Sequence, residues 1–99
     1  MNVNIQTVHF DADRRLIEHI ERKLEKIRSF FERITSVDVF LKIDNPAHHI
    51  KDKVAEIRIQ VPQHNFFVKQ VSKSFEESFD SAYESVIAQI KRHKERQAD

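Results

Sequence analysis

Residues 13–34 read DRRLIEHIERKLEKIRSFFERI, and their apolar side chains recur at intervals of three and four positions. On an α-helix this spacing builds one continuous apolar face, because the helix has about 3.6 residues per turn. We therefore predict an amphipathic helix of about six turns, capped at its start by Asp13. Its core face comprises Leu16, Ile17, Ile20, Leu24, Ile27, Phe31 and Ile34.

The polar positions of the same helix are sorted by charge. At about 100° per residue they fall into a basic stripe and a separate acidic stripe. Charged residues commonly cover exposed helix faces, so a purely solvating role stays open, but the sorting favours an anionic partner for the basic side. The basic stripe comprises Arg15, His19, Arg22, Lys26 and Arg33, with Lys23 at the border of the core face. The acidic stripe comprises Glu18, Glu21, Glu25 and Glu32, joined by Arg14.

Alternation of apolar and polar residues predicts four strands, covering residues 2–7, 37–43, 55–61 and 65–71. A loop follows Asn45-Pro46, and a short turn occupies residues 62–65. A shift of one residue exchanges the two faces of a strand, so the pattern leaves open whether Phe66 or Phe67 enters the core. A second helix opens at Ser74 with a capping box to Glu77. Its core face comprises Phe75, Phe79, Ala82, Val86 and Ile90, flanked by Tyr83.

The element order β-α-β-β-β-α predicts a single α+β domain with a four-stranded mixed sheet. The crossover through the first helix places the first two strands in parallel, and short connections make the later strands antiparallel. Because each strand offers one apolar face, both helices should pack on that one face of the sheet. The opposite face would then be open and carry Phe40, Lys42 and Arg58, with Phe67 and Lys69 if the register of the last strand allows it.

Composition excludes several classes of site. The 99 residues carry 17 Lys and Arg against 16 Asp and Glu, and they include neither Cys nor Gly. There is therefore no disulfide or thiolate site and no glycine-rich phosphate loop. No apolar run reaches eighteen residues and the start does not read as a signal peptide, which makes the cytoplasm the default compartment, without a membrane partner. The six His lack metal-ligand spacing, and the helix acids lie on a solvent face, so we expect neither a metal site nor an enzyme.

The end of the second helix is more basic than its position requires. Cations near a helix C-terminus suit the helix dipole, but Lys91, Arg92, His93, Lys94 and Arg96 exceed what the dipole explains. The outer side of this helix carries mostly small side chains, namely Ser78, Ser81, Ser85 and Ala88, followed by Arg92. Two such helices on one side of a sheet would present a surface suited to folded RNA, which is recognised through phosphates and shape.

Three stretches carry a family resemblance: RKLEKIRSFFERI, the following VDVFLKID, and the final FEESFDSAYESVIAQIKRHKER. In this element order they resemble the ribosome hibernation promoting factors, a family that includes protein Y and proteins once called sigma-54 modulation proteins. The resemblance implies binding to the small ribosomal subunit in the channel used by mRNA and tRNA, and silencing of idle ribosomes in stationary phase or under stress. It implies a non-enzymatic protein without a cofactor or small-molecule substrate, monomeric when free.

The resemblance also indicates site residues. Lys23, Lys26 and Arg33 fall on basic positions of the family in the first helix, and Arg92, His93 and Lys94 on the basic end of the second. With their neighbours, the expected rRNA-binding set is Arg22, Lys23, Lys26, Arg33, Lys91, Arg92, His93, Lys94 and Arg96.

The chain departs from the family pattern in the second helix and nearby. Ser85 and Ala88 stand where relatives often carry bases, Ser74-Phe75-Glu76 replaces the usual Asp-Met-Tyr start, and the usual Gly near the last hairpin is absent. These departures leave the detailed contacts of the second helix open. Because the sequence ends just after that helix, it resembles the short form, a single ribosome-binding domain over residues 1–99 without the C-terminal dimerisation domain.

Two alternatives of another kind stay open at this stage. One is a module that binds free double-stranded RNA, although no loop supplies an obvious basic cluster between strands. The other is a protein-interaction domain that modulates a transcription factor, as the older family name suggests, with the acidic stripe as the contact surface.

Overall fold

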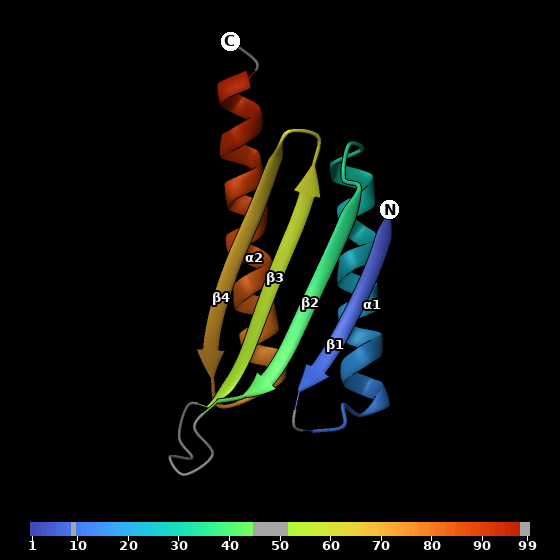
Figure 1. Ribbon diagram of the computed structural model, residues 1–99, viewed down its shortest axis with the longest axis vertical. Helices are drawn as coiled ribbons and strands as arrows, with labels where there is room; N and C mark the ends of the chain where they lie inside the picture. Colours follow the sequence, from blue (N-terminus) through green and yellow to red (C-terminus); the bar gives the residue numbers. More distant parts are fainter. Residues whose placement is uncertain (9, 45–51, 98–99) are drawn as a thin grey trace.

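The computed structural model describes residues 1–8, 10–44 and 52–97, and it shows one four-stranded sheet with two helices (Figure 1). The element order is the predicted one, which confirms the α+β class. Most of the predicted loop after Asp44, including His48 and His49, lies outside the described residues. The elements are β1 Asn2–Val8, α1 Arg14–Phe30, β2 Ser36–Ile43, β3 Lys53–Val61, β4 His64–Ser72 and α2 Phe75–Gln97.

The sheet is mixed, as predicted, and its strands lie side by side in chain order β1-β2-β3-β4. β1 runs parallel to β2, with Ile5 opposite Val39. The β2–β3 and β3–β4 pairs are antiparallel, with Ile57 opposite Val39 on one side and Val68 on the other. The parallel pair requires α1 as its crossover, because parallel neighbours cannot be joined by a tight turn.

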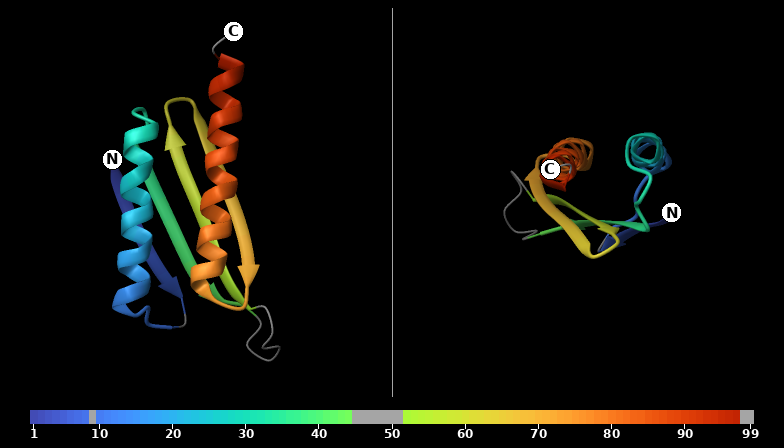
Figure 2. Two further views of the ribbon diagram at one scale, coloured as in Figure 1. Left: turned by 180° about the vertical axis from the view of Figure 1, so that it is seen from behind. Right: turned by 90° about the horizontal axis from the view of Figure 1, so that it is seen from above.

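Both helices cover the same face of the sheet, which Figure 2 shows in its end-on view. The core lies between these two layers and is built from the alternating residues of the strands and one face of each helix. β1 lies at the edge of the sheet, and its inner face is covered only in part: Ile5 is half-buried, whereas Val3 is 42% exposed. The fully enclosed residues include Ile20, Leu24, Ile27, Val37, Val39, Leu41, Ile57, Ile59, Phe79 and Val86. No helix in the described part of the chain is long and apolar enough to cross a membrane.

α1 begins as predicted and ends earlier. The Asp13 side chain accepts a hydrogen bond from the backbone N–H of Leu16 at 2.8 Å, which confirms the cap. The helix ends at Phe30 after 17 residues, and Phe31 is extended, so the prediction of a helix to Ile34 is wrong. The reason is the backbone of Thr35, whose carbonyl accepts from Asn2 and whose N–H donates to Gln60. The chain must leave the helix to reach this sheet position, and it still buries Phe31 and Ile34.

α2 begins at the predicted cap, with one change. The Ser74 hydroxyl accepts from the backbone N–H of Glu77 at 3.1 Å, whereas the backbone N–H of Ser74 donates to the Ser72 hydroxyl in place of the Glu77 side chain. Ser78, expected on the small outer side, is fully buried instead. Its hydroxyl donates to the Lys53 carbonyl, so this position faces β3.

The last hairpin settles the register that the sequence left open. Phe66 is 3% exposed and enters the core, whereas Phe67 is 47% exposed on the open face of the sheet. Arg58 lies over the Phe67 ring at 5.8 Å, so the open face carries the predicted residues. At the turn, Gln63 adopts a φ of 69°, a left-handed conformation that normally favours glycine.

Candidate nucleic-acid interface

The expected RNA-binding residues lie on the two helices, which run in the same direction beside each other (Figure 2). The C-terminal halves of α1 and α2 are therefore at the same end of the molecule, next to the β3–β4 hairpin, and α2 continues past the end of the sheet. Arg33 follows α1 in the turn that leads to β2 instead of extending the helix. The fold thus brings together two basic segments that are sixty residues apart in the sequence.

Exposure differs within this set. Most of the expected RNA-binding residues are exposed and could contact a large partner, whereas two of them are partly packed into the protein. Lys23 and His93 are half-buried. The exposed members are Arg22, Lys26, Arg33, Lys91, Arg92, Lys94 and Arg96.

Ion pairing separates these cations from other bases of the chain. Within residues 1–8, 10–44 and 52–97, no member of the set is in a salt bridge with a carboxylate. By contrast, Arg14 is paired with Glu18 at 3.8 Å, and Arg28 with Glu25 at 3.3 Å. Unpaired surface cations keep their full charge available to an external anion, which is what a phosphate backbone requires.

Lys23 and Lys91 meet across the gap between the helices. They line a groove of about 290 Å³ together with Phe30, Tyr83, Glu84 and Ile87. The Lys23 ammonium lies 5.2 Å from the centre of the Tyr83 ring, within the range of a cation–π contact. Burial raises the pKa of the Tyr83 phenol. The groove therefore places two cations and one acidic residue, Glu84, beside aromatic and aliphatic side chains.

A second hollow lies at the same end of the molecule, between the end of α1, the end of α2 and the β3–β4 turn. Its volume is about 340 Å³, and Arg33, His93 and Lys94 line it beside the β3–β4 turn. The Lys94 ammonium lies 4.8 Å from the centre of the Phe31 ring. Phe30 borders both hollows and is 61% exposed, which is unusual for so large an apolar side chain.

His93 is half-buried and packs against other rings. Its ring stacks on His64 with centroids 4.3 Å apart and meets the edge of Phe66 at 5.3 Å. This packing connects the end of α2 to β4. His93 therefore helps to hold the basic end of α2 in place. Its contact with His64 was not predictable from local spacing, because His64 lies on a different element.

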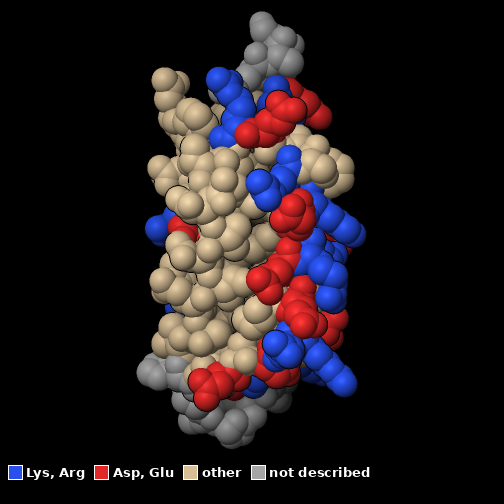
Figure 3. Space-filling model, turned by 90° about the vertical axis from the view of Figure 1, so that its right-hand side faces the viewer, with Lys and Arg blue, Asp and Glu red and all other residues tan. Residues whose placement is uncertain are grey.

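His19 also departs from its predicted place on the basic stripe. It is turned toward α2, where its Nε2 lies 2.6 Å from the Asp80 carboxylate. Figure 3, which views the β1 and α1 edge, shows acidic and basic side chains crowded over the helix layer, beside a sheet edge that is mostly uncharged.

The surface can bind anions and stack against rings, and aromatic side chains are its unpredicted component. Phe30, Phe31 and Tyr83 lie directly beside the cations, although the sequence indicated only that Phe31 and Tyr83 belong to the core. Together, the fold and these side chains define an α+β protein with a helix-borne basic surface that suits a phosphate-rich partner.

Comparison with known proteins gives the family. A family model described as "Sigma 54 modulation protein / S30EA ribosomal protein" matches residues 3–98. The chain belongs to this family, as the resemblance predicted. Among curated proteins, it is 28% identical over 97 residues to the ribosome hibernation promoting factor of Pseudomonas putida KT2440, covering 98% of this chain and 90% of that protein.

Two solved structures share the fold. A ribosomal subunit interface protein from Coxiella burnetii superimposes with a TM-score of 0.82 at 18% identity, over 95% of this chain and 98% of that one. The N-terminal domain of Thermus thermophilus Protein Y gives a TM-score of 0.78 at 19% identity, over 94% and 99%. At these identities, the superpositions confirm the architecture.

Proposed function

We propose that this protein is a non-enzymatic ribosome hibernation factor that binds the RNA of the small ribosomal subunit in the cytoplasm. In this proposal it acts as a monomeric single domain, without cofactor or small-molecule substrate, when growth stops. Membership of the family and the name of the curated relative support the ribosome as partner. The observation that carries the RNA contact is the set of unpaired cations shared by α1 and α2.

The proposed mechanism is steric exclusion from the decoding channel. The domain measures 48 × 23 × 18 Å along its principal axes. A body of this size, held by phosphate contacts along one helix layer, would fill space that mRNA and the A- and P-site tRNAs otherwise occupy. No bond is made or broken, so affinity and position together determine the inhibition. The core of packed strands and helices makes the body rigid enough for this role.

The first experiment is cosedimentation with purified ribosomal subunits. Wild-type protein should pellet with small subunits and not with large ones. A triple variant, Arg22→Glu, Lys26→Glu and Arg33→Glu, should stay in the supernatant, because each substitution replaces a phosphate contact by repulsion. Equal pelleting with both subunits would contradict the choice of partner.

A matched control uses exposed cations on the other side of the molecule. Arg58 lies on β3, Lys69 lies on β4 and Lys73 follows β4; all three are exposed. Their reversal to Glu changes the net charge by the same amount as the first variant. If this control loses small-subunit binding to the same extent, net charge and not the helix surface governs binding, and the proposed interface is wrong.

Competition separates this function from the alternatives. Binding to small subunits should be displaced by mRNA with tRNA and should resist an excess of bulk duplex RNA. Displacement by duplex RNA alone would favour the double-stranded-RNA module. A protein partner that is still captured by the Arg22, Lys26 and Arg33 triple variant would favour the protein-interaction role.

A further inference from the structure

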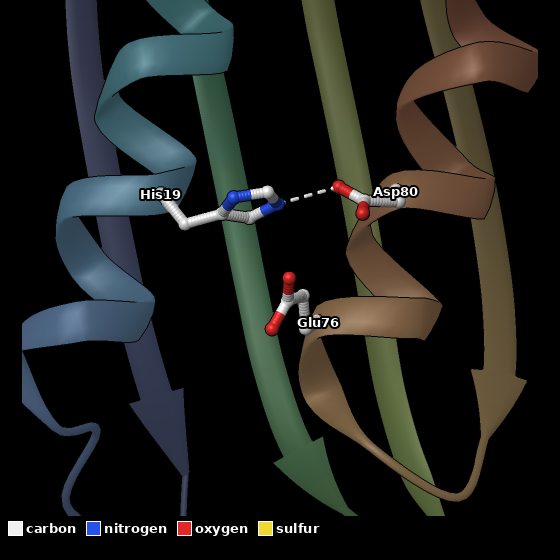
Figure 4. A group of neighbouring side chains, drawn as sticks. All are labelled: His19, Glu76 and Asp80. Atoms are coloured by element: carbon white, nitrogen blue, oxygen red, sulfur yellow. Dashed lines mark hydrogen bonds and ion pairs between the residues drawn. The ribbon is translucent and has the colours of Figure 1, made fainter.

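Three possible metal ligands lie close together between the two helices. His19 lies on α1, and Glu76 and Asp80 lie on the first turns of α2 (Figure 4). One ligand atom of each residue lies within 4.8 Å of those of the other two. Motif spacing does not predict this group, because His19 and Asp80 are 61 positions apart. The sequence-based expectation of no metal site therefore rested on motifs alone.

The imidazole is held in place with its coordinating nitrogen directed at the carboxylates. Its Nε2 lies 2.6 Å from Oδ1 of Asp80, and its side chain is only 20% exposed. The edge of the ring packs against Phe79, with centroids 6.1 Å apart and planes at 78°. A ligand fixed by packing loses little freedom when it coordinates an ion, which favours binding.

The two carboxylates converge because they are one helical turn apart. Glu76 and Asp80 stand at positions i and i+4 of α2, which lie on the same helix face. Figure 4 shows both carboxylates directed toward the His19 ring. In the described part of the chain, neither is in a salt bridge with Lys or Arg. Two negative charges thus face the imidazole with no Lys or Arg ion pair to balance them.

The distances suit a small transition-metal ion. Zinc bonds of about 2.1 Å in tetrahedral geometry separate ligand atoms by about 3.4 Å. This value lies between the 2.6 Å contact of His19 with Asp80 and the 4.8 Å limit of the group, so only small movements of the ligand atoms are needed. One imidazole nitrogen with two carboxylate oxygens is a set that zinc accepts, whereas calcium and magnesium prefer oxygen alone.

We propose that His19, Glu76 and Asp80 form a binding site for a divalent transition-metal ion of the zinc class, with water completing the coordination. The ion would replace the hydrogen bond between His19 and Asp80 and join α1 to the start of α2. The ion would lie near the start of α2, away from the cations at the C-terminal end of that helix, and would act as a structural clamp between the two helices.

The test is a titration of the purified protein with zinc chloride in metal-free buffer. Binding is measured by calorimetry and by NMR of the histidine rings. The adjacent His48 and His49 are replaced by Gln in every protein tested, so that they cannot compete. One ion should bind per chain, and the ring signals of His19 should shift at one equivalent while those of His64 do not. A thermal melt should show a higher Tm with zinc, because the ion binds the folded state.

Three variants locate the site. Asp80→Asn keeps the side-chain volume and Glu76→Gln changes an exposed residue, so both should fold, and each should weaken zinc binding at least tenfold. His64→Gln is the matched histidine control and should bind as the parent does. The proposal is overturned if zinc shows no saturable one-to-one binding, if the His19 signals stay unchanged, or if Asp80→Asn and Glu76→Gln bind like the parent.

Discussion

Neutralising the cations of α1 and of the turn that follows it should change how ribosome binding depends on salt, and not only how strong it is. The triple variant Arg22→Gln, Lys26→Gln and Arg33→Gln removes three exposed, unpaired charges from the proposed interface. Each phosphate contact releases condensed counterions, so each lost contact lowers the slope of log K against log salt concentration. A substitution that merely loosened the fold would lower affinity without this effect on the slope.

The exposed cations of the two helices set the expected magnitude. If about six of them contact phosphates, the slope is about −5, since each contact contributes about −0.9 on a duplex. Between 50 and 200 mM salt, wild-type affinity would then fall roughly a thousandfold. With three contacts removed, the slope is about −2.7 and the fall is roughly fortyfold.

The assay is quantitative cosedimentation with small subunits across this salt range, with unfolding curves to show that the variants are folded. The matched control is Arg14→Gln, Arg28→Gln and Lys42→Gln, which removes the same charge from cations already paired with Glu18, Glu25 and Glu56. Its slope should stay within about one unit of wild type. Equal slope changes in the two triple variants, or a wild-type affinity independent of salt, would refute the reasoning.

Three further predictions concern stability. Phe66→Ala should lower the free energy of unfolding by about 3–5 kcal/mol, because it empties a core position. Phe67→Ala on the open face should change it by less than about 1 kcal/mol. Urea unfolding of the two variants tests the register of β4. Gln63→Gly should stabilise by up to about 1 kcal/mol, because it relieves the left-handed backbone at the hairpin, and an unchanged or lower midpoint would contradict this. Burial raises the pKa of Tyr83 above its usual value of 10.0. The stability that its neutral form contributes is therefore present below pH 10.0 and is lost as the pH rises through the folded-state pKa. Tyr83→Phe should lose less stability at alkaline pH than wild type, as measured by unfolding across this pH range.

Local patterns predicted most of the core faces of the fold, although Leu16, Ile17 and Phe75 are only half-buried. The three-and-four spacing of α1 predicted that Ile20, Leu24 and Ile27 are buried, and alternation predicted the same for Val37 and Val39. These patterns work because side-chain direction along a helix or strand is fixed by its own geometry. The same reasoning identified both helix caps, since Asp13 and Ser74 bond to backbone groups three residues away.

Features that depend on a partner far along the chain were not predictable in this way. The end of α1 at Phe30 follows from the pairing of Thr35 with Asn2 and Gln60, and the burial of Ser78 from its contact with Lys53. In each case the deciding group belongs to another element, whose position is known only once the chain is folded. The hollows beside the cations have the same origin, because residues of α1, the β3–β4 hairpin and α2 line the larger one.

The unpaired state of some cations is nevertheless a consequence of sequence spacing. On a helix, ion pairs form between residues three or four positions apart, as Arg14 does with Glu18 and Arg28 with Glu25. Lys26 has no acidic residue at any of those positions, since Arg22, Lys23, Ser29 and Phe30 occupy them. For Lys26, this spacing leaves no intrahelical carboxylate to compete with phosphate, so its charge is available to an external anion before any tertiary contact is considered.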